Sequence, residues 1–257
     1  MTLGRIPLLV VFLCPIAWAQ FVQQSGKLTG ADSVITLRGV QAGSSVAISA
    51  DGSTATMGGP NDNGGLGAVW IFTRNGGTWS QQGTKIVGAG ADGSSGSVSQ
   101  GAAVALSADG NTLLLGAPGD YVGGPTGAFW VFTRNGGTWS QQIGPVVGTG
   151  AIFTHYLGSD QGAAVALSGD GNTALVGAPA DNEGTGAVWT FTRTNGVWTQ
   201  QGTGLYVSGT KSFFGASLAL SADGTTALVG RSVFTRNKVF EIFPSPWRLL
   251  HQPACVR

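Results

Sequence analysis

The chain has 257 residues, of which only 10% are charged, and its formal net charge at pH 7 is +1. This small and scattered charge excludes nucleic acid as an expected partner, because such binding needs a clustered basic face. Hydrophobic residues make up 42% of the chain, enough for a sizeable core, and the 44 glycines stand between apolar runs where turns are expected. We therefore expect a folded, glycine-rich protein.

The first 19 residues have the pattern of a secretory signal peptide. Arg5 precedes an apolar run from Ile6 to Ala17, and Ala17-Trp18-Ala19 forms a small-x-small cleavage site. The run is shorter than the roughly 20 residues that a membrane-spanning helix needs, and no later stretch is long and apolar enough. We expect a protein without a membrane span that is secreted or displayed at the cell surface and begins near Gln20.

A unit of roughly 55 to 60 residues then recurs four times, which predicts a repeat architecture. The clearest copy begins QGAAVALSGDGNTALVGAPADNEGTGAVWTFTR at Gln161, and the copy that starts at Phe214 breaks off. The spacing is constant between the opening glycine, the aspartate of an Asp-Gly pair and the glycine that opens the Gly-Ala-Pro loop. In chain order these residues are Gly43, Asp51, Gly58; Gly101, Asp109, Gly116; Gly162, Asp170, Gly177; and Gly215, Asp223, Gly230.

Each unit is expected to form four antiparallel strands. In the second copy the candidates are Ala103 to Ser107, Thr112 to Gly116, Ala128 to Arg134, and a strand that opens at Thr138 to Gln142 and continues toward Val147. Asp-Gly, Gly-Ala-Pro and Asn-Gly-Gly turns separate them, and no stretch has a helical period. Four-stranded units packed one on the next predict an all-β fold, a β-propeller of about four blades.

The predicted domains follow the copies. After the leader (1–19), the propeller repeats cover residues 20–243, as an N-terminal strand and join (20–42), three units (43–100, 101–161, 162–213) and an incomplete unit (214–243); an atypical tail (244–257) follows. In the last unit, Ser232 to Asn237 is expected to resume the third strand. Residues Gln20 to Asp32 resemble the end of a unit, and in one interpretation a strand at Phe21 to Leu28 completes the last blade and closes a four-bladed ring. We favour the other interpretation, a chain truncated from a larger propeller with a tail from a shifted reading frame.

The tryptophans recur nine residues apart in three units, as Trp70 and Trp79, Trp130 and Trp139, and Trp189 and Trp198. We interpret them as packing between neighbouring sheets, in preference to stacking on sugars. A hairpin at Asn75-Gly76 is expected to set Trp79 opposite Phe72.

Phe214-Gly215, together with Gly116-Ala117-Pro118 and Gly177-Ala178-Pro179, resembles the FG-GAP repeat of integrin-α-type propellers and their bacterial secreted relatives. The resemblance covers roughly residues 40 to 235, and the second and third copies carry glutamine in place of the phenylalanine. It implies a propeller in which the turn after the first strand often holds calcium, and in which the Gly-Ala-Pro side faces ligands. It therefore implies an adhesion-like binding module.

The residues of that turn disfavour calcium. Each turn offers one carboxylate, whereas calcium takes six to eight oxygen ligands, generally with several carboxylates. Asp-Gly also suits a tight hairpin that needs no metal. We therefore expect turns and no cofactor at Asp51, Asp109, Asp170 and Asp223.

Because antiparallel strands alternate in direction, the Gly-Ala-Pro loops and the joins between units should share one edge, and such loops commonly carry binding sites. The candidate ligand-face residues are Asp62, Asp120 and Asp181 after the loop prolines, Asp92 and Asp160 in the joins, and His155 and Tyr156 in the join 148–160. For the aspartates after the prolines, capping of a turn is the alternative role.

Catalytic patterns are scarce: there is no Gly-x-Ser-x-Gly motif, and His155 and His251 are the only histidines. We predict a non-enzymatic module that binds an extracellular protein or carbohydrate. One alternative is a polysaccharide hydrolase or lyase, which would need two carboxylates about 5 to 9 Å apart. Another is a truncated product without activity of its own. An open propeller would self-associate through its uncovered end.

Overall fold

The structure is a computed structural model that describes residues 23–37, 39–94, 96–124, 126–152, 158–207, 211–232 and 238–244. The predicted signal peptide, His155 and Tyr156 lie outside these residues. No helix among the described residues is long and apolar enough to cross a membrane.

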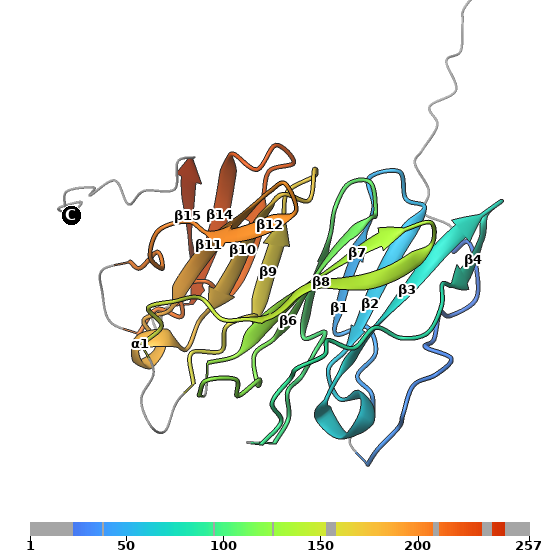
Figure 1. Ribbon diagram of the computed structural model, residues 1–257, viewed down its shortest axis with the longest axis horizontal. Coiled ribbons are helices and arrows are strands. Elements are labelled where there is room, and N and C mark those ends of the chain that lie inside the picture. Colours follow the sequence, from blue (N-terminus) through green and yellow to red (C-terminus); the bar gives the residue numbers. More distant parts are fainter. Residues whose placement is uncertain are drawn as a thin grey trace, which may run out of the picture.

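The described chain folds into four antiparallel sheets, here named blades 1 to 4, with the strands of each blade in sequence order (Figure 1). Blade 1 contains β1 (Ser45–Ile48), β2 (Thr54–Gly59), β3 (Ala68–Asn75) and β4 (Thr78–Gln81). Blade 2 contains β5 (Ala103–Leu106), β6 (Thr112–Ala117), β7 (Ala128–Asn135) and β8 (Thr138–Val146). Blade 3 contains β9 (Ala164–Leu167), β10 (Thr173–Ala178), β11 (Ala187–Thr194) and β12 (Val197–Gln200). Blade 4 contains β13 (Ser217–Leu220), β14 (Thr226–Ser232) and β15 (Lys238–Pro244).

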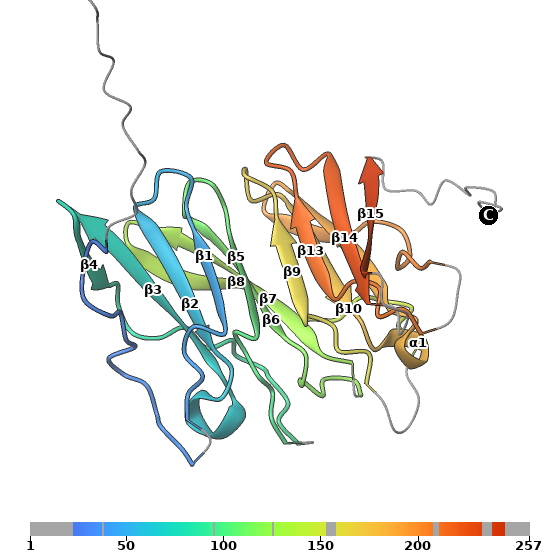
Figure 2. The ribbon, with the colours of Figure 1, turned by 180° about the vertical axis from the view of Figure 1, so that it is seen from behind.

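The blades stand in a row, each packed on the next. Strands β1, β5, β9 and β13 lie side by side in that order, and blades 1 and 4 occupy the two ends of the row (Figures 1 and 2). Parallel bridges join successive blades, Gly67 with Gln100, Gly127 with Gln161, and Gly186 with Phe214. The fold is thus a β-propeller, whose described blades form an arc instead of the closed four-bladed ring that the sequence offered as one alternative.

The predicted strands of the second unit agree with β5 to β8 to within one residue at each compared boundary. Both faces of β7 are apolar and buried, because each face packs against a neighbouring blade: Trp130 and Phe132 face blade 1, whereas Phe129 and Val131 face blade 3. The expectation of a sheet covered on both sides is therefore confirmed for blade 2.

Trp70, Trp130 and Trp189 are fully buried in the cores between blades or under the N-terminal segment, which confirms their packing role. The second tryptophan of each pair packs at the margin of the same cores. Its ring lies under an arginine of the third strand, as in Arg134 over Trp139, with the guanidinium 5.4 Å from the ring centroid.

The predicted cross-strand partner of Trp79 was wrong. Trp79 pairs with Arg74, while Phe72 pairs with Gln81. Gly76 and Gly77 alone form the turn, with φ of +56° and +88°. Asn75 and Thr78 are therefore the cross-strand pair next to the turn.

The predicted third strand of blade 4 was also misplaced. Ser232 ends β14 and pairs with Lys238, so the strand that pairs with β14 on this side is β15. The rest of the predicted segment, residues 233–237, lies outside the described residues. In β15, Phe243 pairs with Ala227, the position that Phe132 holds opposite Leu113 in blade 2. The segment after residue 237 can form this strand because its apolar residues supply the aromatic side chain that the core between blades 3 and 4 needs.

Candidate functional site

The Gly-Ala-Pro loops and the joins meet at one edge of the row, at the bottom of Figure 1, where α1 is drawn. We name this the GAP-loop edge, formed by the loops 60–66, 118–124 and 179–185 and by the joins 30–37, 88–94 and 148–152. Two loops contain a short four-residue turn, η1 (Asp62–Gly65) and α1 (Asp181–Gly184), whose two central residues have left-handed backbone angles. The opposite edge, with the Asp-Gly and Asn-Gly turns, is named the hairpin edge.

The aspartate of each GAP loop is buried and holds a join. The side chains of Asp62, Asp120 and Asp181 are at most 1% exposed, and each carboxylate accepts a hydrogen bond from the backbone of the join that lies about 30 residues earlier. These bonds run from Val34 N to Asp62 Oδ1 (2.6 Å), from Asp92 N to Asp120 Oδ2 (3.0 Å) and from Ile152 N to Asp181 Oδ2 (2.9 Å).

The three carboxylates therefore face the chain itself and not the solvent. A ligand at this edge would contact the surfaces of the loops and joins above them. The alternative role from the sequence, in which the aspartate caps its own loop, applies to Asp120. Asp120 does this directly, since its Oδ1 also accepts a hydrogen bond from Val122 N at 2.9 Å.

The surroundings of the three carboxylates differ in charge. Asp62 forms an ion pair with Lys85, whose ammonium reaches the buried Oδ2. Burial raises the pKa of Asp120, and the negative charge of Asp92 adds to that shift. Burial also raises the pKa of Asp181 to about 6, in spite of the hydrogen bond from Ile152 N.

A tyrosine stands next to Asp181. The Tyr206 hydroxyl donates to the carbonyl oxygen of Gly150 at 2.9 Å. Burial and the nearby Asp181 carboxylate raise the pKa of Tyr206 to about 12. The phenol therefore stays neutral at physiological pH and serves as a hydrogen-bond donor to the join.

The join aspartates differ from those of the loops. Asp92 is partly exposed and accepts a hydrogen bond from Ser94 N at 2.9 Å, which lowers its pKa. Asp160 has a left-handed backbone with φ of +58°, and burial raises its pKa. His155 and Tyr156, the remaining candidates of that join, lie outside the described residues.

A polar groove opens at the GAP-loop edge between the join 30–37, the loop with η1, and residues 96–97, which follow the next join. It has a volume of about 390 Å³ and is lined by Thr36, Asn61, Gly64, Gly65, Gly96 and Ser97. These residues offer hydroxyl, amide and backbone groups and carry no charge. On the same edge, Tyr121 is 37% exposed, and its backbone amide is held by the Asp92 carbonyl.

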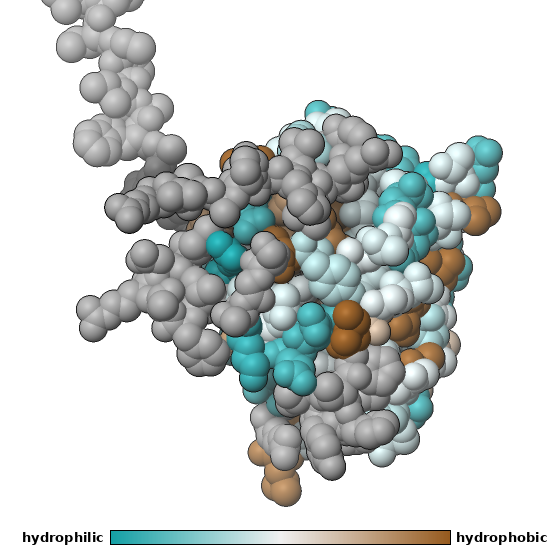
Figure 3. Space-filling view, turned by 90° about the vertical axis from the view of Figure 1, so that its left-hand side faces the viewer, coloured by the Kyte–Doolittle hydropathy of each residue, from teal (hydrophilic) through white to brown (hydrophobic). Residues whose placement is uncertain are grey.

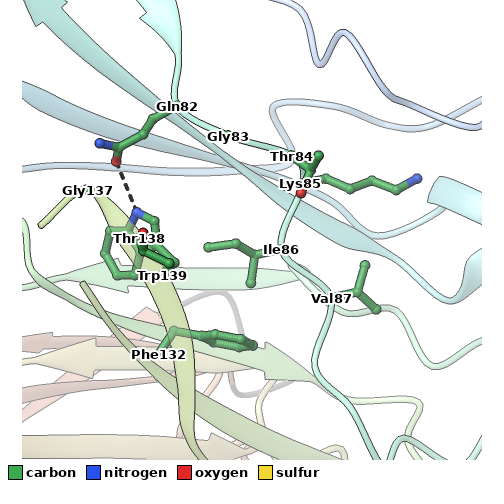
Figure 4. A pocket seen from close by; sticks show the side chains of 10 residues that line it. All are labelled: Gln82, Gly83, Thr84, Lys85, Ile86, Val87, Phe132, Gly137, Thr138 and Trp139. Atoms are coloured by element: carbon green, nitrogen blue, oxygen red, sulfur yellow. Dashed lines mark hydrogen bonds between the residues drawn. The ribbon is translucent and has the colours of Figure 1, made fainter. Parts of the chain in front are cut away.

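A second cavity of about 350 Å³ lies on the outer side of the row, between residues 82–87 and the hairpin of blade 2 (Figure 4). Its apolar wall, Ile86 and Phe132, belongs to the core between blades 1 and 2. The Trp139 indole N–H donates to Gln82 Oε1 at 3.1 Å across its mouth. Because its apolar wall belongs to this core and Trp139 binds Gln82 beside it, we interpret the cavity as a seam between blades.

In the Asp-Gly turns, each carboxylate accepts hydrogen bonds from its own turn. The Ser49 hydroxyl and the Ser53 amide both donate to Asp51 Oδ1, and these hydrogen bonds lower the pKa of Asp51 to about 2. The other three turns repeat the serine-to-aspartate bond. Their N–H and O–H groups point at the carboxylate, where a cation would need oxygen lone pairs. Among the described residues, no three His, Cys, Asp or Glu side chains cluster as metal ligands would.

Sequence reasoning missed a set of buried glutamines. Gln100 is fully buried, and its amide binds Gly88 twice, accepting from the N–H at 2.5 Å and donating to the C=O at 2.9 Å. Gln161 makes the same pair of bonds with Gly148. In the last unit Phe214 takes this place and packs edge-on against Phe243. The available signal was the recurrence of glutamine where the FG-GAP repeat has phenylalanine.

No family model matches the sequence, and no curated protein matches it. Similar solved structures include TolB from Acinetobacter baumannii, with 15% identity and a TM-score of 0.44 over 78% of this chain and 40% of TolB. Another is hydrazine synthase from Kuenenia stuttgartiensis, with 14% identity and a TM-score of 0.47 over 88% of this chain and 49% of that one. This chain therefore spans less than half the length of these structures. The propeller assignment follows from the arrangement of the chain's own blades.

Proposed function

We propose that this chain is an exported, non-enzymatic binding module that presents its GAP-loop edge to an extracellular ligand. The observation that carries the proposal is the repeated bond between a buried loop aspartate and the preceding join. This bond fixes the surface loops before a ligand arrives. A pre-organised surface loses less conformational entropy on binding, which favours affinity.

The chemistry of the groove favours an uncharged polar ligand. Thr36, Asn61 and Ser97 supply hydrogen-bonding side chains, and the glycines expose backbone groups. The exposed ring of Tyr121 adds a surface on which a sugar or an apolar side chain can pack. A neutral glycan and a polar segment of an extracellular protein both meet these requirements.

A hydrolase acting on polysaccharide is the competing function. Asp92 and Asp120 are the neighbouring carboxylates that such an enzyme would use, since the pKa of Asp92 is lowered and that of Asp120 is raised. Against this role, Asp120 is buried and makes the same bond to a join as Asp62 and Asp181 do in other blades. A contact that recurs in three blades supports an architectural role.

Retention on immobilised ligands tests the proposal. The purified protein is passed over cellulose, xylan, chitin and gelatin, the last as an extended polypeptide, and the bound fraction is measured. Thr36→Arg fills the groove and Tyr121→Ala removes the exposed ring, so both are expected to abolish retention while the melting temperature stays unchanged. Thr78→Arg, an exposed threonine at the hairpin edge, is the matched control and should bind normally.

Three results would speak against the proposal. If the protein is retained on none of the probes, a binding role has no support. If Thr36→Arg and Thr78→Arg lose retention equally, the binding surface is not at the GAP-loop edge. Release of reducing sugar from a polysaccharide, abolished by Asp92→Asn or Asp120→Asn, would establish the hydrolase instead.

A further inference from the structure

The two ends of the row expose apolar side chains that are buried at the equivalent positions of the inner blades. On blade 1, Val46 is 69% exposed, whereas its counterpart Val104 on blade 2 is 9% exposed. On blade 4, Ile242 is 70% exposed, whereas its counterpart Ile71 on blade 1 is fully buried. Exposed residues of this kind, gathered on one face, mark an interaction surface.

The exposed face of blade 4 is equivalent to the face with which blades 1, 2 and 3 each pack against the next blade. It carries Ala219, Leu228, Phe240 and Ile242, which occupy the register positions of Ala47, Thr56, Val69 and Ile71 in blade 1. In blade 1, the residues Ala47, Val69 and Ile71 of this face form the core against blade 2. Figure 3 looks onto the blade 4 end and shows hydrophobic residues between polar ones.

The exposed face of blade 1 is equivalent to the face with which blades 2, 3 and 4 each pack against the blade before them. Val46 and Ile48 lie on it, at the places of Val104 and Leu106 in the core between blades 1 and 2. The face of blade 4 and the face of blade 1 are therefore the two halves of the blade–blade interface that the chain already forms three times.

The sheet edges give an independent sign of the same fit. Within the described residues, blade 4 has three strands, and none of them lies on the outer side of β15. Against blade 1, the N-terminal segment 24–31 lies where the fourth strand and the join of a preceding blade would lie. Gln24 accepts a hydrogen bond from Arg74 as Gln82 does from Arg134, and Ala31 N donates to Gln81 as Ala89 N does to Gln141.

In blade 1 the corresponding stretch pairs with the third strand. Gln82 N donates to the Ile71 carbonyl at 2.8 Å, and Ile86 exchanges two backbone bonds with Val69. By the same register, Leu28 corresponds to Ile86, and Phe240 of β15 corresponds to Val69. A blade 4 placed against blade 1 would thus meet an N-terminal segment already in position to extend its sheet.

We propose that a second copy of this chain supplies that blade. Blade 4 of one copy packs on blade 1 of the other, and residues 24–28 of the second copy pair with β15 of the first. When blade 4 of each copy packs on blade 1 of the other, the two copies form a closed ring of eight blades. This number is within the four to eight blades that propellers typically have. The partner's blades cover both apolar ends, and its N-terminal segment pairs with the outer edge of β15.

Disulfide trapping between two different chains tests the proposal. Cys14 and Cys255 are replaced by serine, and chains carrying Leu28→Cys and Phe240→Cys are mixed and oxidised. A covalent dimer that contains one chain of each kind is expected, with no dimer from either chain alone. The positive control is a single chain with Val69→Cys and Ile86→Cys, the pair already adjacent in the structure.

Light scattering gives a second readout without cross-links. The unmodified protein is expected at twice the mass of one chain, and Phe240→Asp should weaken this association at least about tenfold. Because Phe240 is 57% exposed, this change should leave the melting of the single chain unaltered. Val197→Asp, at a residue 63% exposed on the hairpin edge, is the control and should still dimerise.

The proposal is overturned if the protein stays at the mass of one chain at every concentration. It is equally overturned if Leu28→Cys and Phe240→Cys join only when both are placed in the same chain, since the chain would then close on itself.

Discussion

Aspartates lie at both edges of the blades, and they serve the fold in opposite ways. At the hairpin edge, Asp51 and Asp109 are exposed, and bonds from their own turns lower their pKa values. At the GAP-loop edge, Asp120 and Asp181 are buried, and burial raises their pKa values. The same side chain thus closes a local turn at one edge and fastens a distant segment at the other.

The difference lies in the origin of the hydrogen-bond donors. Asp109 is bonded by Ser107 and Asn111, two residues away on either side. Asp120 is bonded by the amide of Asp92, 28 residues earlier. Loss of the first kind of contact loosens one turn, whereas loss of the second frees a join that forms part of the binding edge.

The largest effect is expected where the GAP loop of blade 2 begins. A methyl group on Gly116 would run into the backbone carbonyl of Gly162 in the next blade, and neither backbone can yield. Gly116→Ala should therefore lower the free energy of unfolding by about 3 kcal/mol, measured by urea denaturation.

Gly136→Ala is the control at the hairpin edge. A methyl group at this position would meet no atom within 4 Å, and only the φ of +55° disfavours a side chain. The free energy of unfolding is therefore expected to fall by about 1 kcal/mol. Equal losses for the two variants would contradict the close contact between blades.

The next largest effect separates the two kinds of aspartate. Asp120→Ala leaves the part-buried amides of Asp92 and Val122 without their acceptor, so urea denaturation should show a loss of about 2 kcal/mol. Asp109→Ala removes an exposed turn contact and should cost less than about 1 kcal/mol. A larger cost at Asp109 would reverse the assignment of local and distant roles.

A smaller effect depends on pH. The pKa of Asp181 is raised from its ordinary 3.8 to about 6, so the folded protein binds more protons than the unfolded chain between these pH values. The contribution of Asp181 to stability therefore falls as pH rises from about 4 to 6 and stays constant above that range.

Asp181→Asn does not titrate and keeps an oxygen for Ile152 N. The melting temperature of this variant minus that of the unmodified protein should therefore increase from pH 4 to pH 7. A difference that stays the same across this range would show that Asp181 has its ordinary pKa.

The smallest expected effect is that of calcium. The Asp-Gly turns at the hairpin edge are satisfied by their own donors, so millimolar calcium should shift the melting temperature by less than about 1 °C. A rise of several degrees that Asp109→Asn removes would show that these turns bind the ion.

Much of the fold was predictable because its signals are local and repeated. The strands of blade 2, the two-residue turns and the buried tryptophans follow from alternation, glycine placement and the period of the copies. The misplaced strand in blade 4 shows the limit. SVFTRN copies the earlier third strands, but Phe243 of β15 fills the core position, and that choice depends on packing between blades.

The site was predictable in its place but not in its exposure. Alternation of strand direction brings Asp62, Asp120 and Asp181 to one edge together with the joins. No local pattern showed that these carboxylates would be covered, because their partners lie in the joins about 30 residues earlier. The groove was equally hidden, since it arises only where the join 30–37, the loop with η1 and residues 96–97 meet.

Amide hydrogen exchange at Val34, Asp92 and Ile152 tests most directly whether the GAP-loop edge is a fixed platform. Each of these amides donates to a buried loop aspartate, so all three should exchange as slowly as amides within the strands, and Asp120→Ala should speed exchange at Asp92 alone. Exchange at the rate of an unstructured peptide in the unmodified protein would contradict the account, because the joins would then not be held by the aspartates.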